Sequence, residues 1–183
     1  RYATSAEIKL VEVAGLPVFK KTEELMVPEQ AQKIAHEIDE ADGVIIGTPE
    51  YDHSVPAILL STLAWLSYGI HPLLDMPVMI TGASYGALGA SRAQAQLRQI
   101  LDSPEIKARV MPSSEFLLAN SLKAFDAEGN LIDQERVDQL DGLFEDFLLF
   151  ADISKQLNHA NSNNEKEMNN FSWDEGSGRR DEE

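Results

Sequence analysis

The chain has no cysteine among its 183 residues. Disulfide bonds, thiolate metal ligands and a cysteine nucleophile are therefore excluded. Basic residues are also scarce, because 15 Lys and Arg stand against 31 Asp and Glu, which gives a formal net charge of -16. Surfaces that bind nucleic acid or anionic membranes need clustered Lys and Arg, so we expect neither kind of partner.

Long apolar runs are missing as well. No stretch approaches the roughly 18 apolar residues of a membrane-spanning helix, and the first residues, RYATSAEIKL, do not resemble a secretory signal. We therefore expect a cytoplasmic protein without membrane attachment. The four histidines, at positions 36, 53, 71 and 159, have no metal-ligand spacing, so we predict no metal site.

The most informative segment that is present is GVIIGTPEYDHSVPAILL at 43–60. Residues 43–48 are apolar and rich in β-branched side chains, which is typical of a parallel strand covered on both faces. Pro49 ends this strand and a turn follows. We place Ser54 at the N-cap of the next helix, with Pro56 in its first turn. Ligands bind beyond the carboxyl ends of strands in open parallel sheets, so the turn is a predicted ligand site.

Strand-like and helix-like patterns alternate along the chain, which predicts a single α/β domain with a parallel sheet. Strands are expected at 8–13, 43–48, 77–83 and 109–119. Helices are expected near 28–40, 54–69, 89–102 and 133–157. Asp133 is predicted to cap the last helix, while Trp65 and Tyr68 are expected in a helix core or a subunit interface.

The composition becomes polar and acidic after residue 157. A segment of this kind buries too little apolar surface to fold alone, so we assign 1–157 to the domain and predict a flexible tail at 158–183. Phe171 and Trp173 are the apolar exceptions in this tail. They could dock on the domain or remain solvated.

A glycine-rich segment, TGASYGALGAS at 81–91, follows the third predicted strand. It matches neither the dinucleotide fingerprint G-x-G-x-x-G nor a phosphate-binding Walker loop, because the spacing is wrong and the lysine is missing. It does contain G-x-S-x-G at 82–86, the pattern of a hydrolase nucleophile elbow, with Ser84 as the nucleophile. A hydrolase also needs a downstream histidine, and the only one is His159 in the polar tail.

Two motifs taken together, TPEYDHSVP at 48–56 and TGASYGALGASRAQAQLRQIL at 81–101, resemble the NADPH-dependent FMN reductase family, which includes quinone and azo-dye reductases. The resemblance extends over about residues 7–155. It implies a flavodoxin-like fold: an open parallel sheet in the order 2-1-3-4-5 with helices on both faces. It also implies FMN as cofactor and assembly as a homodimer or homotetramer.

The resemblance further implies which residues border the isoalloxazine ring of FMN. These residues are Pro49, Glu50, Tyr51, Asp52, Ser84, Tyr85 and Gly86. The first four would act largely through backbone atoms, and two of them have a structural alternative: Glu50 could complement a helix N-terminus, and Tyr51 could be ordinary packing. Hydride would pass from NADPH or NADH to the flavin N5 and on to a quinone, azo dye, free flavin or similar small acceptor, without a catalytic side chain. An FMN-binding module without turnover and a serine hydrolase using Ser84 remain the alternative functions.

The chain departs from the family pattern at two places in these motifs and again at its start. Asp52 replaces the usual Asn, and Leu60 and Ser61 replace a Lys-Asn pair that often lies at a subunit contact, which leaves the oligomeric state open. The family's first strand and its Ser- and Arg-containing phosphate loop have no counterpart. We expect a longer native chain to supply both, with the strand between 8–13 and 43–48, and weak FMN binding without them.

Overall fold

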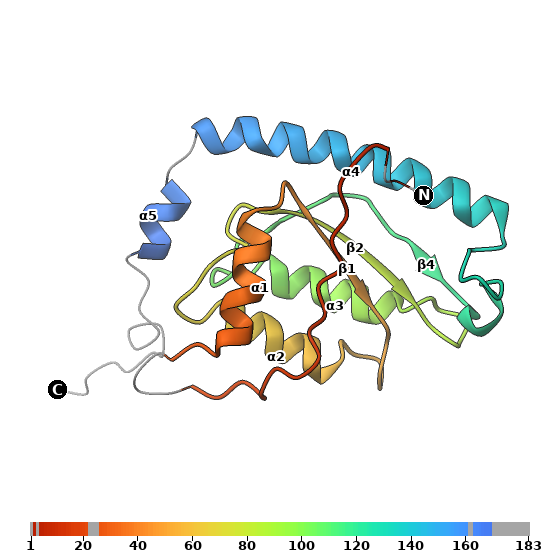
Figure 1. Cartoon of the computed structure of the whole chain (residues 1–183), viewed down its shortest axis with the longest axis horizontal. Helices are drawn as coiled ribbons and strands as arrows, with labels where there is room; N and C mark the ends of the chain where they lie inside the picture. Colours follow the sequence, from red (N-terminus) through yellow and green to blue (C-terminus); the bar gives the residue numbers. More distant parts are fainter. Residues whose placement is uncertain (1, 3, 22–25, 161–162, 170–183) are drawn as a thin grey trace.

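The computed structural model describes residues 2, 4–21, 26–160 and 163–169, and within them the chain forms a four-stranded parallel sheet with helices packed against it (Figure 1). The strands are β1 (Val44–Thr48), β2 (Pro77–Ala83), β3 (Arg109–Val110) and β4 (Leu117–Leu118). β2 is central, because β1 pairs with one of its edges while β3 and β4 both pair with the other. The predicted open parallel sheet is confirmed, together with its strands near 43–48 and 77–83.

The segment 109–119, predicted as one strand, forms two short ones. β3 pairs with the start of β2 and β4 with its end, and the chain between them leaves the sheet. Pro112 has no N–H to donate to a neighbouring strand, and Ser113 has a left-handed backbone with φ 55°. These two residues explain why the ladder is interrupted.

The helices confirm the sequence pattern closely. They are α1 (Glu29–Asp39), α2 (Ala57–Leu66), α3 (Ser91–Leu101), α4 (Gln134–Ala160), the short α5 (Asn163–Asn169) and a 3-10 turn at Ser121–Lys123. Asp133 caps α4 as predicted, since its Oδ1 accepts a hydrogen bond of 3.0 Å from the backbone N–H of Glu135. Within the described residues, no helix combines the length and the apolar character needed to cross a membrane.

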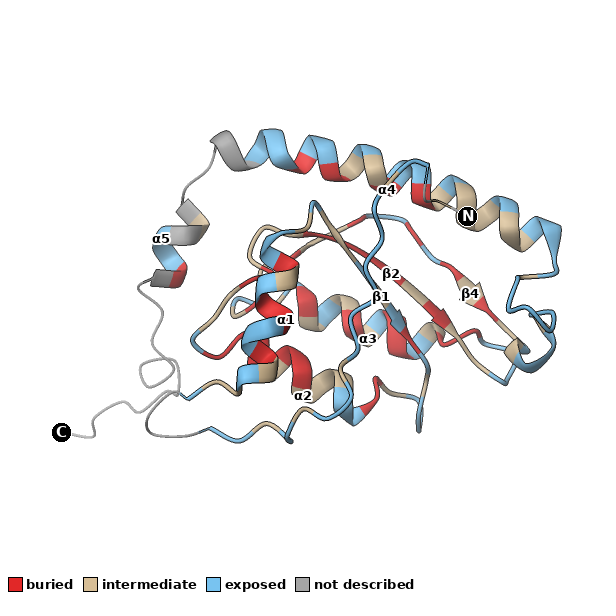
Figure 2. Ribbon diagram, viewed as in Figure 1, coloured by how far each residue is buried: buried red, intermediate tan, exposed pale blue. Residues whose placement is uncertain are grey.

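The two faces of β2 are covered by different helices. Val78 and Ile80 point to a core shared with buried side chains of α1, α2 and α3. Met79 points to the opposite face, where it packs with Phe147 of α4. All three β2 side chains are almost fully buried, as the buried stretch of β2 in Figure 2 shows. The prediction of helices on both faces is therefore confirmed.

Trp65 and Tyr68 lie in a small aromatic cluster at the end of α2. Both are buried, and they pack with Ala31 of α1 and with Phe19. The indole Nε1 of Trp65 donates a hydrogen bond of 2.8 Å to the carbonyl oxygen of Pro17. The core interpretation of these two residues is confirmed, and the Trp65 indole attaches the segment before α1 to the domain.

The strand predicted at 8–13 is absent, and this prediction was wrong. Ile8 and Leu10 are 60% and 87% exposed, and the segment has no strand partner within the described residues. Within the described residues, β1 likewise pairs only with β2. Ile45 of β1 is 44% exposed, so the prediction that both faces of β1 are covered was also wrong. A strand forms only when its backbone groups are paired, and the segment at 8–13 has no neighbour with which to pair.

The segment predicted as a tail begins inside a helix. α4 continues to Ala160, and α5 lies against the domain, with Met168 buried and Asn164 Nδ2 donating a hydrogen bond of 2.8 Å to Asp75 Oδ1. These contacts attach residues 163–169 near the amino ends of β2 and β3. Phe171 and Trp173 lie outside the described residues, so their docking stays a prediction.

His71 gives the domain a pH-dependent contribution to stability. Burial lowers the pKa of this histidine below its usual value, and a hydrogen bond with the backbone of Glu105 opposes the shift only in part. The unfolded chain therefore binds a proton at His71 more readily than the folded chain does. The stability that neutral His71 contributes is fully present above the usual histidine pKa of about 6.5, and it is lost as the pH falls through the lowered pKa of the folded state.

We expect His71→Gln to lose less unfolding free energy than the wild type between neutral pH and pH 5.5, measured by urea denaturation. A pH dependence of the variant equal to that of the wild type would contradict the assignment.

Candidate functional site

The two loops singled out in the sequence leave the sheet side by side. β1 and β2 are parallel and paired in register up to Thr48 and Gly82. The first loop (residues 49–55) and the second loop (residues 84–90) therefore start at the same edge. This is the edge at which open parallel sheets bind their ligands. The seven predicted site residues are all brought to it, while their contacts with a cofactor stay a prediction.

The first loop contains a tight turn with an unusual backbone. Tyr51 and Ser54 exchange both backbone hydrogen bonds, at 3.1 and 2.9 Å. The two residues between them, Asp52 and His53, have φ angles of 50° and 62°, which defines a type I′ turn. Tyr51 is 64% exposed, so it is not packed into the sheet edge, and Pro49 and Asp52 are exposed beside it.

Ser54 does not cap α2, and this prediction was wrong. The helix begins at Ala57 with Pro56 in the N-cap position and without a side-chain cap. Ser54 closes the turn with its backbone and donates its hydroxyl to Gln96 Oε1 at 2.8 Å. The serine is therefore used to attach the first loop to α3.

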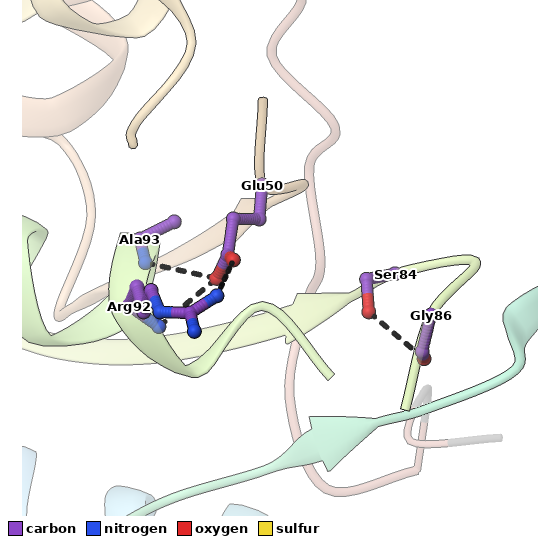
Figure 3. A network of polar contacts seen from close by, with 5 residues as sticks. All are labelled: Glu50, Ser84, Gly86, Arg92 and Ala93. Atoms are coloured by element: carbon purple, nitrogen blue, oxygen red, sulfur yellow. Dashed lines mark hydrogen bonds and ion pairs between the residues drawn. The ribbon is translucent and has the colours of Figure 1, made fainter. Parts of the chain in front are cut away.

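The carboxylate of Glu50 caps α3. Its Oε2 accepts hydrogen bonds from the backbone N–H groups of Arg92 (2.9 Å) and Ala93 (3.3 Å), and its Oε1 lies 3.4 Å from the Arg92 guanidinium (Figure 3). α3 has no cap of its own, because Ala90 occupies the N-cap position with φ 64°. A carboxylate in this place satisfies two free helix donors and opposes the positive end of the helix dipole. The structure therefore confirms that the Glu50 side chain complements a helix N-terminus, while the contact of this residue with the ring stays a prediction.

The second loop is hydrogen-bonded to the chain that follows β4. The backbone N–H groups of Asn120 and Ser121 donate to the carbonyl oxygens of Gly86 and Ser84, each at 3.0 Å. The Ser84 hydroxyl donates to the Gly86 carbonyl at 3.2 Å (Figure 3). The Ser84 hydroxyl is therefore engaged within its own loop, as expected of a serine that stabilises a turn. Tyr85, at the tip of this loop, is 75% exposed.

The glycines of the second motif have different roles. A Cβ atom added at Gly82 or Gly89 would lie within 2.8 Å of backbone atoms of Thr48 or Leu117, so both glycines are required by close packing. An added Cβ at Gly86 would meet nothing within 4 Å, and the φ angle of this residue is not in the left-handed region. The fold itself does not need glycine at 86. Exposed backbone beside open space is what the approach of a flat cofactor requires, so the loop fits such a ligand.

Side chains of α3 that the sequence analysis did not single out hold these loops. Gln94 is buried, and its Nε2 donates to the carbonyl oxygens of Phe116 (2.9 Å) and Gly89 (3.3 Å). Gln96 binds Ser54 and Val55. A usable signal was present, because Gln94 lies between Ala93 and Leu97 on the apolar face of the helix, where a polar side chain needs internal partners. Within the described residues, no group of three or more His, Cys, Asp and Glu side chains could hold a metal ion.

An open parallel sheet with helices on both faces and two loops at its carboxyl edge is the architecture of the doubly wound α/β proteins, the class that includes flavodoxin-like folds. The chain belongs to the NADPH-dependent FMN reductase family, whose model matches residues 1–123. A solved structure of the flavoenzyme NAD(P)H:(acceptor) oxidoreductase FerB from Paracoccus denitrificans is similar with a TM-score of 0.70 at 24% identity, covers 81% of each chain, and supports the fold.

Curated relatives agree with this assignment. The chain is 51% identical to the NADH:(hydroxy)cinnamate reductase subunit CrdA of Vibrio ruber, covering 85% of this chain and 77% of the relative. It is 41% identical to the NADH-dependent flavin reductase subunit 2 of Lactobacillus johnsonii, covering 85% and 86%. It is 37% identical to a quinone reductase of Escherichia coli, covering 73% and 72%. The chain is thus an oxidoreductase that uses FMN, with NAD(P)H as hydride donor.

Proposed function

We propose that the first and second loops border the isoalloxazine ring of FMN, and that the enzyme reduces a small aromatic or quinoid acceptor at the expense of NADH. The residues in contact with the ring would be Pro49, Glu50, Tyr51, Asp52, Ser84, Tyr85 and Gly86. The observation that carries this proposal is the pairing of Thr48 with Gly82, which starts both loops at one edge of the sheet. When bound, FMN supplies the hydride-accepting and hydride-donating chemistry, so the chain needs no catalytic side chain of its own.

The contacts of these residues indicate how each would act. The Glu50 carboxylate is engaged by α3, so this residue would face the ring through its backbone. Tyr51 and Tyr85 are exposed aromatic side chains, one on each loop, and they would limit the space open to a flat acceptor. Gly86 would let the ring approach the backbone of the second loop.

The phosphate of FMN would be held elsewhere, next to the open edge of β1. This edge has no strand partner within the described residues, and Ile45 is exposed beside it. An unpaired edge with apolar side chains favours the addition of another strand. We propose that a further parallel strand pairs here in the native protein and that the loop after it holds the phosphate, which would place the phosphate at the same edge of the sheet as the ring.

The choice of donor and acceptor follows the relatives. Two of them, at 51% and 41% identity, are named for NADH, and both are named as subunits. We therefore propose NADH as the preferred donor and a protein assembly with more than one chain, either with copies of itself or with a second subunit. A hydroxycinnamate, a quinone or a free flavin are the acceptor classes that the relatives' names suggest.

The test is a steady-state assay of the native protein, including the strand and phosphate loop proposed above, purified with FMN. We expect a yellow protein that oxidises NADH with a higher kcat/KM than NADPH and passes electrons to a quinone or a hydroxycinnamate, with size-exclusion chromatography reporting the assembly. A colourless protein whose Ser84 reacts with a fluorophosphonate would support the hydrolase instead. A yellow protein that oxidises neither nucleotide would leave only FMN binding.

A further inference from the structure

The first loop is attached to α3 at both of its ends. Glu50, at its start, accepts hydrogen bonds from the first backbone N–H groups of the helix. Gln96, one turn further along α3, receives Ser54 and Val55 at the end of the loop. The type I′ turn of residues 51–54 is thus held between two points of one rigid helix.

The contact with Gln96 is a single acceptor serving two donors. Its Oε1 receives the Ser54 hydroxyl at 2.8 Å and the backbone N–H of Val55 at 2.9 Å. Val55 is buried, with 3% exposure, so water cannot replace the lost partner of its N–H at low cost. Gln96 is itself half-buried and is fixed on a helix, which makes it a precise anchor for the loop.

The same helix anchors the second loop. α3 follows directly after Gly89 and Ala90, and Gln94 binds the carbonyl oxygen of Gly89 at 3.3 Å. The separation between the two loops is therefore set by α3 and by the side chains that hold each loop to it. Asp52 and His53 have left-handed backbones, a conformation that persists in residues with side chains only when surrounding contacts impose it.

We propose that Gln96 is a positioning residue: acting with the Glu50 cap, it holds the turn of residues 51–54 at the distance from the second loop that FMN needs. The proposal rests on the proposed function of these loops. Gln96 does not touch the cofactor in this scheme. Its effect reaches the ring through Tyr51 and the backbone beside it.

The experiment compares three variants of the full chain. Gln96→Met removes the acceptor while keeping a flexible side chain of similar size, Gln96→Glu keeps an acceptor, and Gln99→Met makes the same change as the first at an exposed position of the same helix. Two readouts are used: amide hydrogen exchange of residues 51–55 without FMN, and FMN affinity with the visible circular dichroism of the bound flavin.

We expect Gln96→Met to raise amide exchange of residues 51–55 and to weaken FMN binding, each about tenfold, because two hydrogen bonds are lost. The flavin circular dichroism should change with it. Gln96→Glu and Gln99→Met should stay within about twofold of the wild type in both readouts. Unchanged amide exchange in Gln96→Met would show that Gln96 does not hold the turn of residues 51–54, whether or not FMN binds. Raised exchange with wild-type affinity and spectrum would overturn the positioning role. Failure of the wild type to bind FMN would count against the proposed function. Amide exchange would still decide whether Gln96 holds the turn of residues 51–54.

Discussion

Replacing Gly89 by alanine is expected to lower the free energy of unfolding by about 3 kcal/mol, the sum of a left-handed backbone penalty and overpacking. Gly89 has φ +58°, and an added Cβ would lie 2.5 Å from the carbonyl carbon of Leu117 and 2.8 Å from its Cα. These are backbone atoms of β4, so a change of side-chain rotamer cannot relieve the clash. Either β4 or the start of α3 must move, which also disturbs the second loop. Urea denaturation followed by circular dichroism measures the effect.

Gly129 provides the matched control for this prediction. It also has a left-handed backbone, with φ +83°, but an added Cβ there would meet nothing within 4 Å. Gly129→Ala should therefore cost only the backbone term, about 1 kcal/mol. The difference between the two variants isolates the steric contact with β4. Equal losses for Gly89→Ala and Gly129→Ala would show that the packing of the second loop on β4 is looser than described.

The central strand and the helices could be predicted because their signals are local. β2 was predicted over its observed bounds, since an apolar run between turn residues has a clear period and composition. α4 was predicted from its cap and its helical spacing, which are also local. The segment 8–13 has the same kind of composition, yet it forms no strand within the described residues. Strand formation depends on a paired neighbour, and this is a property of the sheet that a single segment does not encode.

The site could be predicted in position but less well in chemistry. The two loops were found because a strand followed by Pro or Gly indicates the carboxyl edge of a parallel sheet. The sequence predicts that Glu50 borders the ring largely through its backbone and leaves open that its side chain complements a helix N-terminus. Its capping of α3 depends on the crossing of a loop and a helix 42 residues apart, and Gln96 reaches Ser54 over the same separation. Such pairings follow from the packing of α3 against β2, so residue type and spacing do not reveal them.

Gly86 offers the sharpest test of the cofactor site, because cofactor binding and stability should respond differently there. We expect Gly86→Val to weaken FMN binding about 30-fold, since overpacking of this size costs about 2 kcal/mol and each factor of ten corresponds to about 1.4 kcal/mol. The unfolding free energy without FMN should stay nearly constant, because the space beside Gly86 is open and its φ angle lies outside the left-handed region. Titration of FMN followed by fluorescence quenching gives the affinity, and urea denaturation gives the stability.

The control for Gly86→Val is Gly142→Val on α4, a second glycine whose added Cβ would meet nothing within 4 Å. It lies outside both loops, so it should leave FMN affinity within about twofold of the wild type, the range expected for a change remote from a binding contact. A fall in affinity limited to Gly86→Val would support the approach of the ring to the second loop. Equal affinity in both variants would mean that the ring does not pass beside Gly86, and the second loop would then lose its role in the proposed site. A fall in the stability of Gly86→Val without FMN would instead mean that the loop needs this glycine for its own conformation.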